Sequence, residues 1–165
     1  MEKFVHESVR LSCDLNRAMR MFLIQSLAEK WLGDVKIENK IGGTFQFKMI
    51  IDQNEIEIED AEILEKKIER FIKIRVKVPK QFENFFLEEN SIIEINFMQG
   101  TSRTEFCTEI HLLQKGFKDE ESDKIRYDFG MYWANKLELL RQEINGDWVI
   151  EDRDLNRSYL MGGRL

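Results

Sequence analysis

The chain has 165 residues, a formal net charge of −6 and a hydrophobic content of 42%. This length and this hydrophobic content suit one domain with its own core, and they exclude a chain that is disordered throughout. The acidic balance, with an isoelectric point of about 5.1, argues against nucleic acid or an anionic membrane surface as the main partner. No apolar run is long enough to cross a bilayer, and the first residues lack the apolar core of a signal peptide. We therefore expect a cytoplasmic protein that does not insert into a membrane.

The first element expected is a β-strand over Phe4–Cys13, because apolar and polar residues alternate there. Glu7 is the one charged residue on the apolar side of this alternation. His6 lies on the polar side, so we interpret it as a surface residue rather than as a ligand or a catalytic group.

Two short helices are expected after this strand. Asp14 is placed to cap a helix over Leu15–Leu23. Ser26 is followed three residues later by Glu29, and this capping-box pattern predicts that a second helix starts at Ser26. Gly33 is a suitable left-handed residue for the end of that helix. Together the two helices form an elbow between strands.

A series of strands is expected in the middle of the chain, since several further segments alternate between apolar and polar residues. These segments are Val35–Glu38, Thr44–Met49, Glu55–Lys67, Arg70–Val78, Ser91–Gln99 and Arg103–Gln114. Within the third segment the apolar side changes parity, which predicts a β-bulge near Glu59–Asp60. Pro79–Asn90 interrupts the series, and we expect its phenylalanines to fold over the mouth of the sheet.

The hairpin that turns near Glu69 and Arg70 separates charge along the chain. Residues 52–69 are mainly acidic, whereas residues 70–80 include basic residues and no acidic ones. One interpretation is a pair of oppositely charged patches that recruit a partner. The alternative, which we favour, is that the charges pair across the two strands and contribute about 0.2–1 kcal/mol per pair.

The last long element expected is an amphipathic helix over Ser122–Ile144, about 34 Å in length. Its apolar stripe consists of Phe129, Trp133, Leu137, Leu140 and Ile144. Strands followed by one long helix predict an α+β fold. In this fold a curved antiparallel sheet of about six to seven strands surrounds the C-terminal helix, with two short helices after the first strand.

Few residues are suited to catalysis or to metal binding. No glycine-rich nucleotide loop and no Cys/His cluster is present in the sequence. His6 and His111 are the two histidines, and both are expected to face outward; Cys13 and Cys107 are far apart and suit buried positions. We therefore predict no catalytic residues, no metal site and no cofactor, and the sequence does not support an enzyme.

Several local motifs occur in a fixed order along the chain. They are Ser26–Leu32, Ile41–Phe47, Gly100–Thr101 with the strand that follows, Lys115–Phe117, and Gly130–Trp133 with Leu137 and Leu140. Together they resemble the pattern of proteins homologous to the activator of heat-shock protein 90 ATPase, with Gln114 in place of a histidine of that pattern. The resemblance implies the helix-grip fold of the START-like (SRPBCC) superfamily over residues 1–145, with residues 146–165 as a C-terminal extension. It also implies a cavity between the sheet and the long helix.

The resemblance favours a module that binds a small apolar molecule or a lipid in that cavity. The residues expected to line it are Phe45, Phe47, Phe97, Phe129, Trp133 and Leu137, with Phe85 or Phe86 near the mouth. The competing interpretation is that these side chains simply fill the core.

Two other functions compete with ligand binding. The first is a protein-interaction or co-chaperone-like module whose partner is a chaperone or another protein. The second, ranked last because no acid–base pair is evident, is a cyclase or hydrolase that acts on a hydrophobic substrate. A large enclosed pocket would support ligand binding, and a filled core would support the interaction module.

The extension at residues 146–165 contains apolar clusters around Trp148 and Tyr159, on either side of a charged run. Such aromatic residues are unusual in a wholly solvated tail. We therefore predict that the extension packs on its own domain or on a second copy, as a homodimer contact. The alternative is a frayed terminus.

Overall fold

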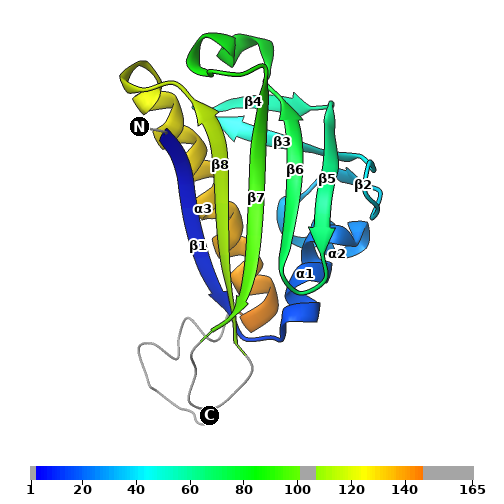
Figure 1. Ribbon diagram of the computed structural model, residues 1–165. Helices are drawn as coiled ribbons and strands as arrows, with labels where there is room; N and C mark the ends of the chain where they lie inside the picture. The colour runs from blue at the N-terminus through cyan, green and yellow to red at the C-terminus, as the bar shows by residue number, and fades with distance from the viewer. Residues whose placement is uncertain (1–2, 101–106, 147–165) are drawn as a thin grey trace, which may run out of the picture.

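The computed structural model describes residues 3–100 and 107–146 of the chain (Figure 1). In chain order the elements are β1 (Lys3–Leu11), α1 (Leu15–Leu23), α2 (Gln25–Leu32), β2 (Val35–Ile37), β3 (Phe45–Ile51), β4 (Asn54–Ile58), β5 (Ala61–Lys67), β6 (Phe71–Lys77), η1 (Lys80–Phe85), β7 (Asn90–Gln99), β8 (Thr108–Phe117), η2 (Glu120–Ser122) and α3 (Asp123–Asn145), where η marks a 3-10 helix. This order confirms the α+β prediction. The start of the predicted strand Arg103–Gln114 and the apolar clusters of the extension lie outside the described residues.

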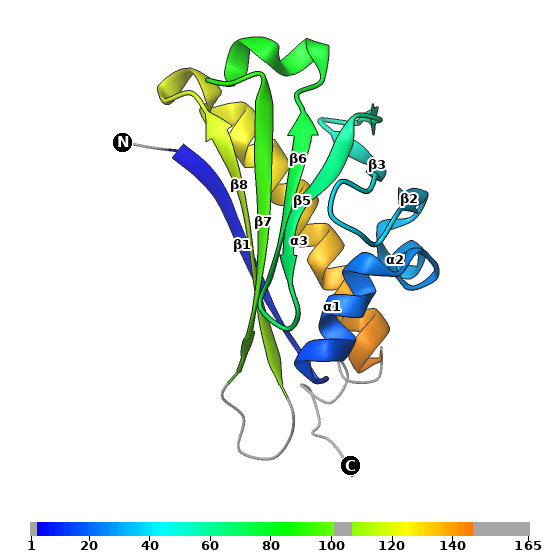
Figure 2. The same cartoon turned by 45° about the vertical axis from the view of Figure 1, so that its right-hand side comes forward.

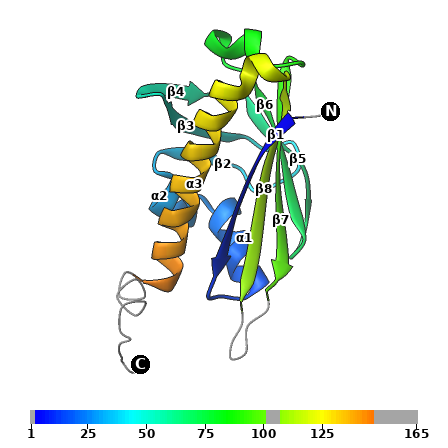
Figure 3. The ribbon, with the colours of Figure 1, turned by 90° about the vertical axis from the view of Figure 1, so that its left-hand side faces the viewer.

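The strands form two antiparallel sheets, of which the larger is curved. Five strands pair in the order β1-β8-β7-β6-β5, and three pair in the order β2-β3-β4. The first strand therefore lies beside the last one, with Ser8 opposite His111. Figure 2 shows the curvature of the five-stranded sheet, and Figure 3 shows the helices and the smaller sheet together on one side of it.

The β-bulge predicted near Glu59–Asp60 is wrong, because the chain changes sheets at these residues. β4 pairs with β3, whereas β5 pairs with β6. An isolated bridge between Thr44 and Glu62 connects the two sheets next to the crossing. Ile58 and Ala61 are both buried, on successive strands, so the parity shift in the sequence marks a crossing between sheets.

Only one of the two predicted N-terminal helix caps is present, whereas Gly33 ends α2 with a positive φ of 88°, as expected. Asp14 caps α1 as expected, since its Oδ1 accepts a hydrogen bond of 2.8 Å from the backbone N–H of Arg17. The capping box at Ser26 is wrong: α2 begins one residue earlier, at Gln25, and its cap residue Ile24 makes no side-chain cap bond. Gln25 instead accepts a hydrogen bond of 3.0 Å from the backbone of Ile37, which ties the helix to β2.

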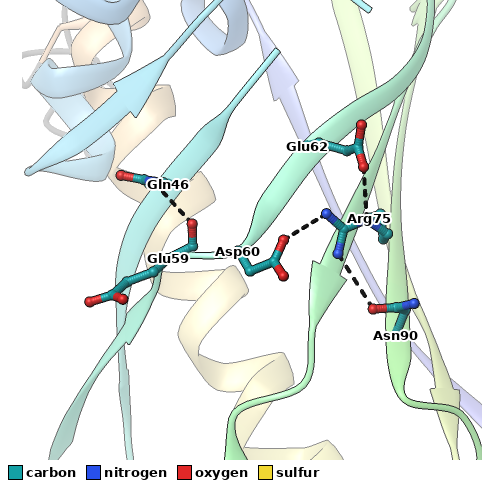
Figure 4. A network of polar contacts seen from close by, with 6 residues as sticks. All are labelled: Gln46, Glu59, Asp60, Glu62, Arg75 and Asn90. Atoms are coloured by element: carbon teal, nitrogen blue, oxygen red, sulfur yellow. Dashed lines mark hydrogen bonds and ion pairs between the residues drawn. The ribbon is translucent and has the colours of Figure 1, made fainter. Parts of the chain in front are cut away.

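The favoured interpretation of the charged hairpin is confirmed, because its charges pair across β5 and β6 (Figure 4). Arg75 Nη2 lies 2.7 Å from Asp60 Oδ1, and Arg75 Nε lies 3.1 Å from Glu62 Oε1. Lys73 Nζ lies 3.8 Å from Glu65. These groups are partly exposed, so each pair contributes about 0.2–1 kcal/mol at most.

Four of the five residues in the predicted apolar stripe of α3 are buried, and the fifth, Ile144, is partly buried. Phe129, Trp133, Leu137 and Leu140 are between 0% and 3% exposed. The helix ends agree with the prediction to within one residue. Within residues 3–100 and 107–146, no helix has the length and apolar content needed to cross a membrane.

Candidate functional site

The predicted cavity region, between the sheets and α3, is filled by aromatic side chains. Phe45 and Phe47 are in edge contact with ring centroids 5.9 Å apart, and Phe47 lies 5.7 Å from Trp133. The space left among these rings and their neighbours on β6, β7 and α2 is about 10 Å³. A single water molecule needs at least that much room. The interior at this point therefore holds no more than one water.

The opposite end of the interior is closed by a second aromatic cluster. Phe129 lies 5.4 Å from Phe82, 6.0 Å from Phe86 and 5.6 Å from Phe117 between ring centroids. Phe82 and Phe86 are 8% and 4% exposed, and Phe85 is half-buried. The segment around η1 folds its phenylalanines over the mouth of the sheet, as expected, and it seals this end.

The predicted cavity residues are thus all buried, but the structure does not gather them around one space. Phe45, Phe47 and Trp133 surround the small residual space. Phe97 packs instead against Phe22 of α1, at 5.5 Å between ring centroids. The other two predicted residues lie on α3. Phe129 belongs to the aromatic cluster that closes the opposite end, and Leu137 lies elsewhere in the core.

A chain of polar groups crosses the apolar interior. Trp133 Nε1 donates to Gln114 Oε1 at 3.0 Å, and Gln114 Nε2 donates to Ser91 Oγ at 3.2 Å. Ser91 Oγ in turn donates to the backbone oxygen of Lys115 at 2.7 Å. Gln114 and Ser91 are 2% and 1% exposed. The position where glutamine replaces the histidine of the family pattern is therefore a core position that connects α3 to β8 and β7.

The two histidines, which the sequence places on outward-facing sides of distant strands, lie together on the outer face of the sheet. His6 Nε2 is 2.9 Å from His111 Nδ1, and the rings stack with centroids 5.1 Å apart. His111 Nε2 is 3.0 Å from Glu109 Oε1, and Arg10 Nη2 donates to Glu109 Oε2 at 3.0 Å. The hydrogen bonds from His111 and Arg10 lower the pKa of the Glu109 carboxyl below its usual value.

Sequence reasoning missed this cluster because it depends on strand order. The outward-facing sides of β1 and β8 were correctly predicted, but nothing in the local pattern indicates that the first and last strands are neighbours. The one signal available in the sequence was a histidine on the outward side of each strand, His6 on β1 and His111 on β8.

The outer side of α3 carries exposed apolar residues that the inner stripe did not predict. Tyr127, Met131 and Leu139 are 65%, 44% and 44% exposed, and we call this set the α3 outer stripe. Ile50 of β3, 58% exposed, lines a surface hollow together with Met131 and Leu139. Phe4 of β1, 42% exposed, lines a second hollow with Tyr127 and Met131. Exposed apolar side chains of β1, α3 and β3 thus border these two hollows, together with charged residues such as Asp123, Asp128 and Lys136.

Glu7 lies on the inward side of β1, half-buried against α3, as the sequence alternation indicates. Its Oε2 lies near Gly130, where an added Cβ would come within 3.2 Å of it. Burial raises the pKa of this carboxyl above its usual value, an effect partly offset by the neighbouring His6.

Comparison with solved structures identifies the architecture. A protein of Mesorhizobium loti matches with a TM-score of 0.67 at 17% identity, covering 88% of this chain and 98% of that one. CalU16 from Micromonospora echinospora matches with a TM-score of 0.62 at 12% identity, over 93% and 91% of the two chains. The Aha1 dimer from Colwellia psychrerythraea matches with a TM-score of 0.58 at 11% identity, over 86% and 96%.

No protein-family model matches the chain, and no curated protein matches it. Identities this low establish the fold and nothing finer. A curved antiparallel sheet with a long C-terminal helix on its inner side, together with these matches, gives the chain the helix-grip fold of the START-like proteins.

Proposed function

We propose that this chain is a protein-interaction module that docks another protein chain on the α3 outer stripe, and that the docking partner is a second copy of the same chain. One observation carries the proposal: apolar side chains that would suit a core are exposed along α3, while the interior beneath is filled. Apolar side chains that gather on an exposed face of a small domain mark an interaction site when the patch is large.

The spacing of the stripe suits a helix-to-helix contact. Tyr127, Met131 and Leu139 are spaced by four and by eight residues over a length of about 18 Å, with the exposed Asn135 between the last two. In an antiparallel pairing about a two-fold axis, Tyr127 of one copy would oppose Leu139 of the other. Each copy would then contribute the same surface, as in most homodimers.

Two further observations support an interaction module. The Aha1 structure from Colwellia psychrerythraea, which shares the fold, is a dimer. Separately, the local motifs of this chain resemble those of proteins homologous to the activator of heat-shock protein 90 ATPase. We further propose that the chain is related to that family and that a chaperone is a second partner.

Sedimentation velocity tests this function. The protein should sediment as a dimer, and Met131→Glu and Leu139→Glu should each give a monomer that keeps the circular dichroism spectrum of the folded protein, because a charge on the stripe opposes its burial. Ile68→Glu is the matched control, since Ile68 is 78% exposed and lies on the β5–β6 turn. A monomeric wild-type protein, or dissociation by the control as well, would rule out the docking surface.

A second candidate is the small apolar ligand expected from the family resemblance. The observation that favours it is the buried polar chain, since Gln114 and Trp133 place hydrogen-bonding groups inside an otherwise apolar interior. A lipid or small apolar molecule with one polar group would bond to Gln114. The interior would have to open, because it now has room for one water.

Nuclear magnetic resonance titration with a fatty acid tests the ligand candidate. Binding should shift the resonances of Phe45, Phe47 and Phe129 and leave Lys73 and Lys77 of β6 unchanged. Gln114→Leu should weaken the binding, because the polar group of the ligand would lose its partner. Shifts confined to the charged hairpin would exclude the interior as the site.

A further inference from the structure

A hollow on the outer face of the five-stranded sheet takes no part in the functions proposed above. It measures about 600 Å³ and lies on the side of β7 and β8 that faces away from α3. Its floor is apolar, because Phe71 of β6, Met98 of β7 and Leu113 of β8 border it. Met98 is 45% exposed, and the other two side chains are half-buried. Apolar side chains that an occupant could cover are therefore open to solvent.

One side of this hollow is positively charged. Lys67 and Arg70 line it from the two ends of the β5–β6 turn, and both are exposed. In the part of the chain that the structure describes, neither side chain makes a hydrogen bond or an ion pair, whereas Arg75 of β6 is paired with acidic residues. The hydrogen-bonded pair His6 and His111 lines the other side. An occupant of the hollow should therefore combine an apolar group with negative charge.

The first part of the C-terminal extension has this composition. Residues 147–154 contain four acidic residues and one arginine, together with the apolar cluster that begins at Trp148, and we call them the acidic segment. Residues 155–165 contain two arginines and no acidic residue, so only the first part matches the charge of the hollow.

We propose that the acidic segment of the chain binds in the hollow on the outer face of its own sheet. Trp148 packs against the apolar floor, and Glu151 and Asp152 lie beside Lys67 and Arg70. Each exposed ion pair adds little to the free energy of binding. The segment is covalently attached, however, and this tether gives it an effective concentration on the order of millimolar at the hollow, so weak contacts suffice.

The extension begins close enough to reach the hollow. Asn145, the last residue of α3, accepts a hydrogen bond of 2.9 Å on Oδ1 from the backbone N–H of Ser12, just after β1 (Figure 1). Met98 is opposite Glu109, which is opposite Arg10, so Met98 is two residues and two strands away from Ser12. This offset corresponds to about 12 Å along the sheet. Eight extended residues cover about 27 Å, which is enough to round the end of the sheet and pass Met98.

Acrylamide quenching of tryptophan fluorescence in the full chain tests the proposal. Trp31 and Trp133 are 2% and 3% exposed, so the quenchable signal comes from Trp148. In the wild-type protein, Trp148 should be quenched less than in a free peptide with the sequence of the extension. The double variant Lys67→Glu/Arg70→Glu should raise the quenching to the level of the peptide, because like charges then face the acidic segment.

Two further variants isolate the charge match. Lys77→Glu is the control, since this exposed lysine lies at the other end of β6, outside the hollow, and it should leave the quenching of Trp148 at the wild-type level. Glu151→Lys and Asp152→Lys, added to the double variant, should restore the protection, because the ion pairs form again with the charges exchanged. Circular dichroism of each variant verifies that the fold is intact.

Three results would overturn the proposal. The first is wild-type Trp148 that is quenched as strongly as the free peptide. The second is protection that the double variant retains, which would show that the extension packs elsewhere. The third is protection that is lost on dilution, which would assign the bound segment to a second copy. Sedimentation reports separately on docking at the α3 outer stripe, so failure of one proposal is distinguishable from failure of the other.

Discussion

The indole N–H of Trp133 donates a hydrogen bond of 3.0 Å to Oε1 of Gln114, and this bond joins α3 to β8 inside the core. Trp133 is 3% exposed and Gln114 is 2% exposed. Gln114 passes the connection on to Ser91 of β7. The long helix is therefore held to the sheet by an oriented polar contact as well as by apolar packing.

Trp133→Ala should lower the free energy of unfolding by about 3–5 kcal/mol, because a large buried ring is lost and Gln114 is left without its donor. In a thermal melt this corresponds to a fall of roughly 6–20 °C for a chain of this size. Glu143→Ala on the exposed side of the same helix, outside the α3 outer stripe, should change stability by no more than about 0.5 kcal/mol. A melting temperature for Trp133→Ala within about a degree of wild type would show that the buried side of α3 is wrongly assigned.

Asp14→Ala should destabilise the protein by about 1 kcal/mol, because the first turn of α1 loses the carboxylate that accepts the Arg17 N–H. Asp14→Asn should retain most of that stability, since an amide oxygen also caps. Ser26→Ala should have almost no effect, because Ser26 is exposed and caps no helix. Urea unfolding of the three variants measures this, and equal losses at Asp14 and Ser26 would contradict the observed helix starts.

The titration of Glu7 should make stability depend on pH. Burial raises the folded-state pKa of this carboxyl, so its ionised form is disfavoured in the folded protein. The protonated group costs nothing below the unfolded pKa of about 4.3, and stability falls as pH rises through the higher folded-state pKa. Glu7→Gln should therefore stabilise the protein at neutral pH and lose that advantage in acid.

Chemical denaturation at neutral and acidic pH measures the Glu7 effect. The exposed Glu88→Gln is the control, since the same charge is removed without a change in burial. A gain for Glu7→Gln that is the same at both pH values would show that the carboxyl is not disfavoured by burial.

Deletion of the residues after Asn145 tests the prediction that the C-terminal extension packs. If the extension contacts its own domain, the truncated chain should melt at a lower temperature; if it contacts a second copy, a dimer should become a monomer in sedimentation. Hydrogen exchange of the full chain should show protected amides near Trp148 and Tyr159. If the two chains melt and sediment identically and the amides of the extension exchange without protection, the extension is a frayed terminus and the prediction is wrong.

Local periodicity predicted most of the elements, although it joined β4 and β5 into one strand, and it could not predict how the elements pair. The inner stripe of α3 and the outward side of β8 follow directly from side-chain spacing, since burial on one face leaves a period of 3.6 or 2. The crossing between sheets at Glu59–Asp60 produces the same parity shift as a bulge, so the sequence does not distinguish them. The capping box predicted at Ser26 is absent. The side chain of Gln25 instead bonds to Ile37, and this tertiary contact helps to position the start of α2.

The candidate sites were harder to predict than the helices and strands, because they depend on tertiary structure. Six residues were predicted to line a cavity because they share an inward side, and all of them are buried. Whether inward side chains leave a space or fill it depends on their packing, which a sequence pattern does not contain. The contact between His6 and His111 likewise requires β1 to lie beside β8, a pairing between the first and the last strand of the described residues.

Native mass spectrometry of the freshly purified protein tests most directly whether α3 docks a second copy while the interior beneath it is filled. One spectrum gives the number of chains in the assembly and the mass of any small molecule that remains bound. We expect a dimer whose mass equals two chains, and a monomer of one chain mass for Met131→Glu. A monomeric wild-type protein that carries the added mass of an apolar ligand would contradict it and would place the function in an opened interior.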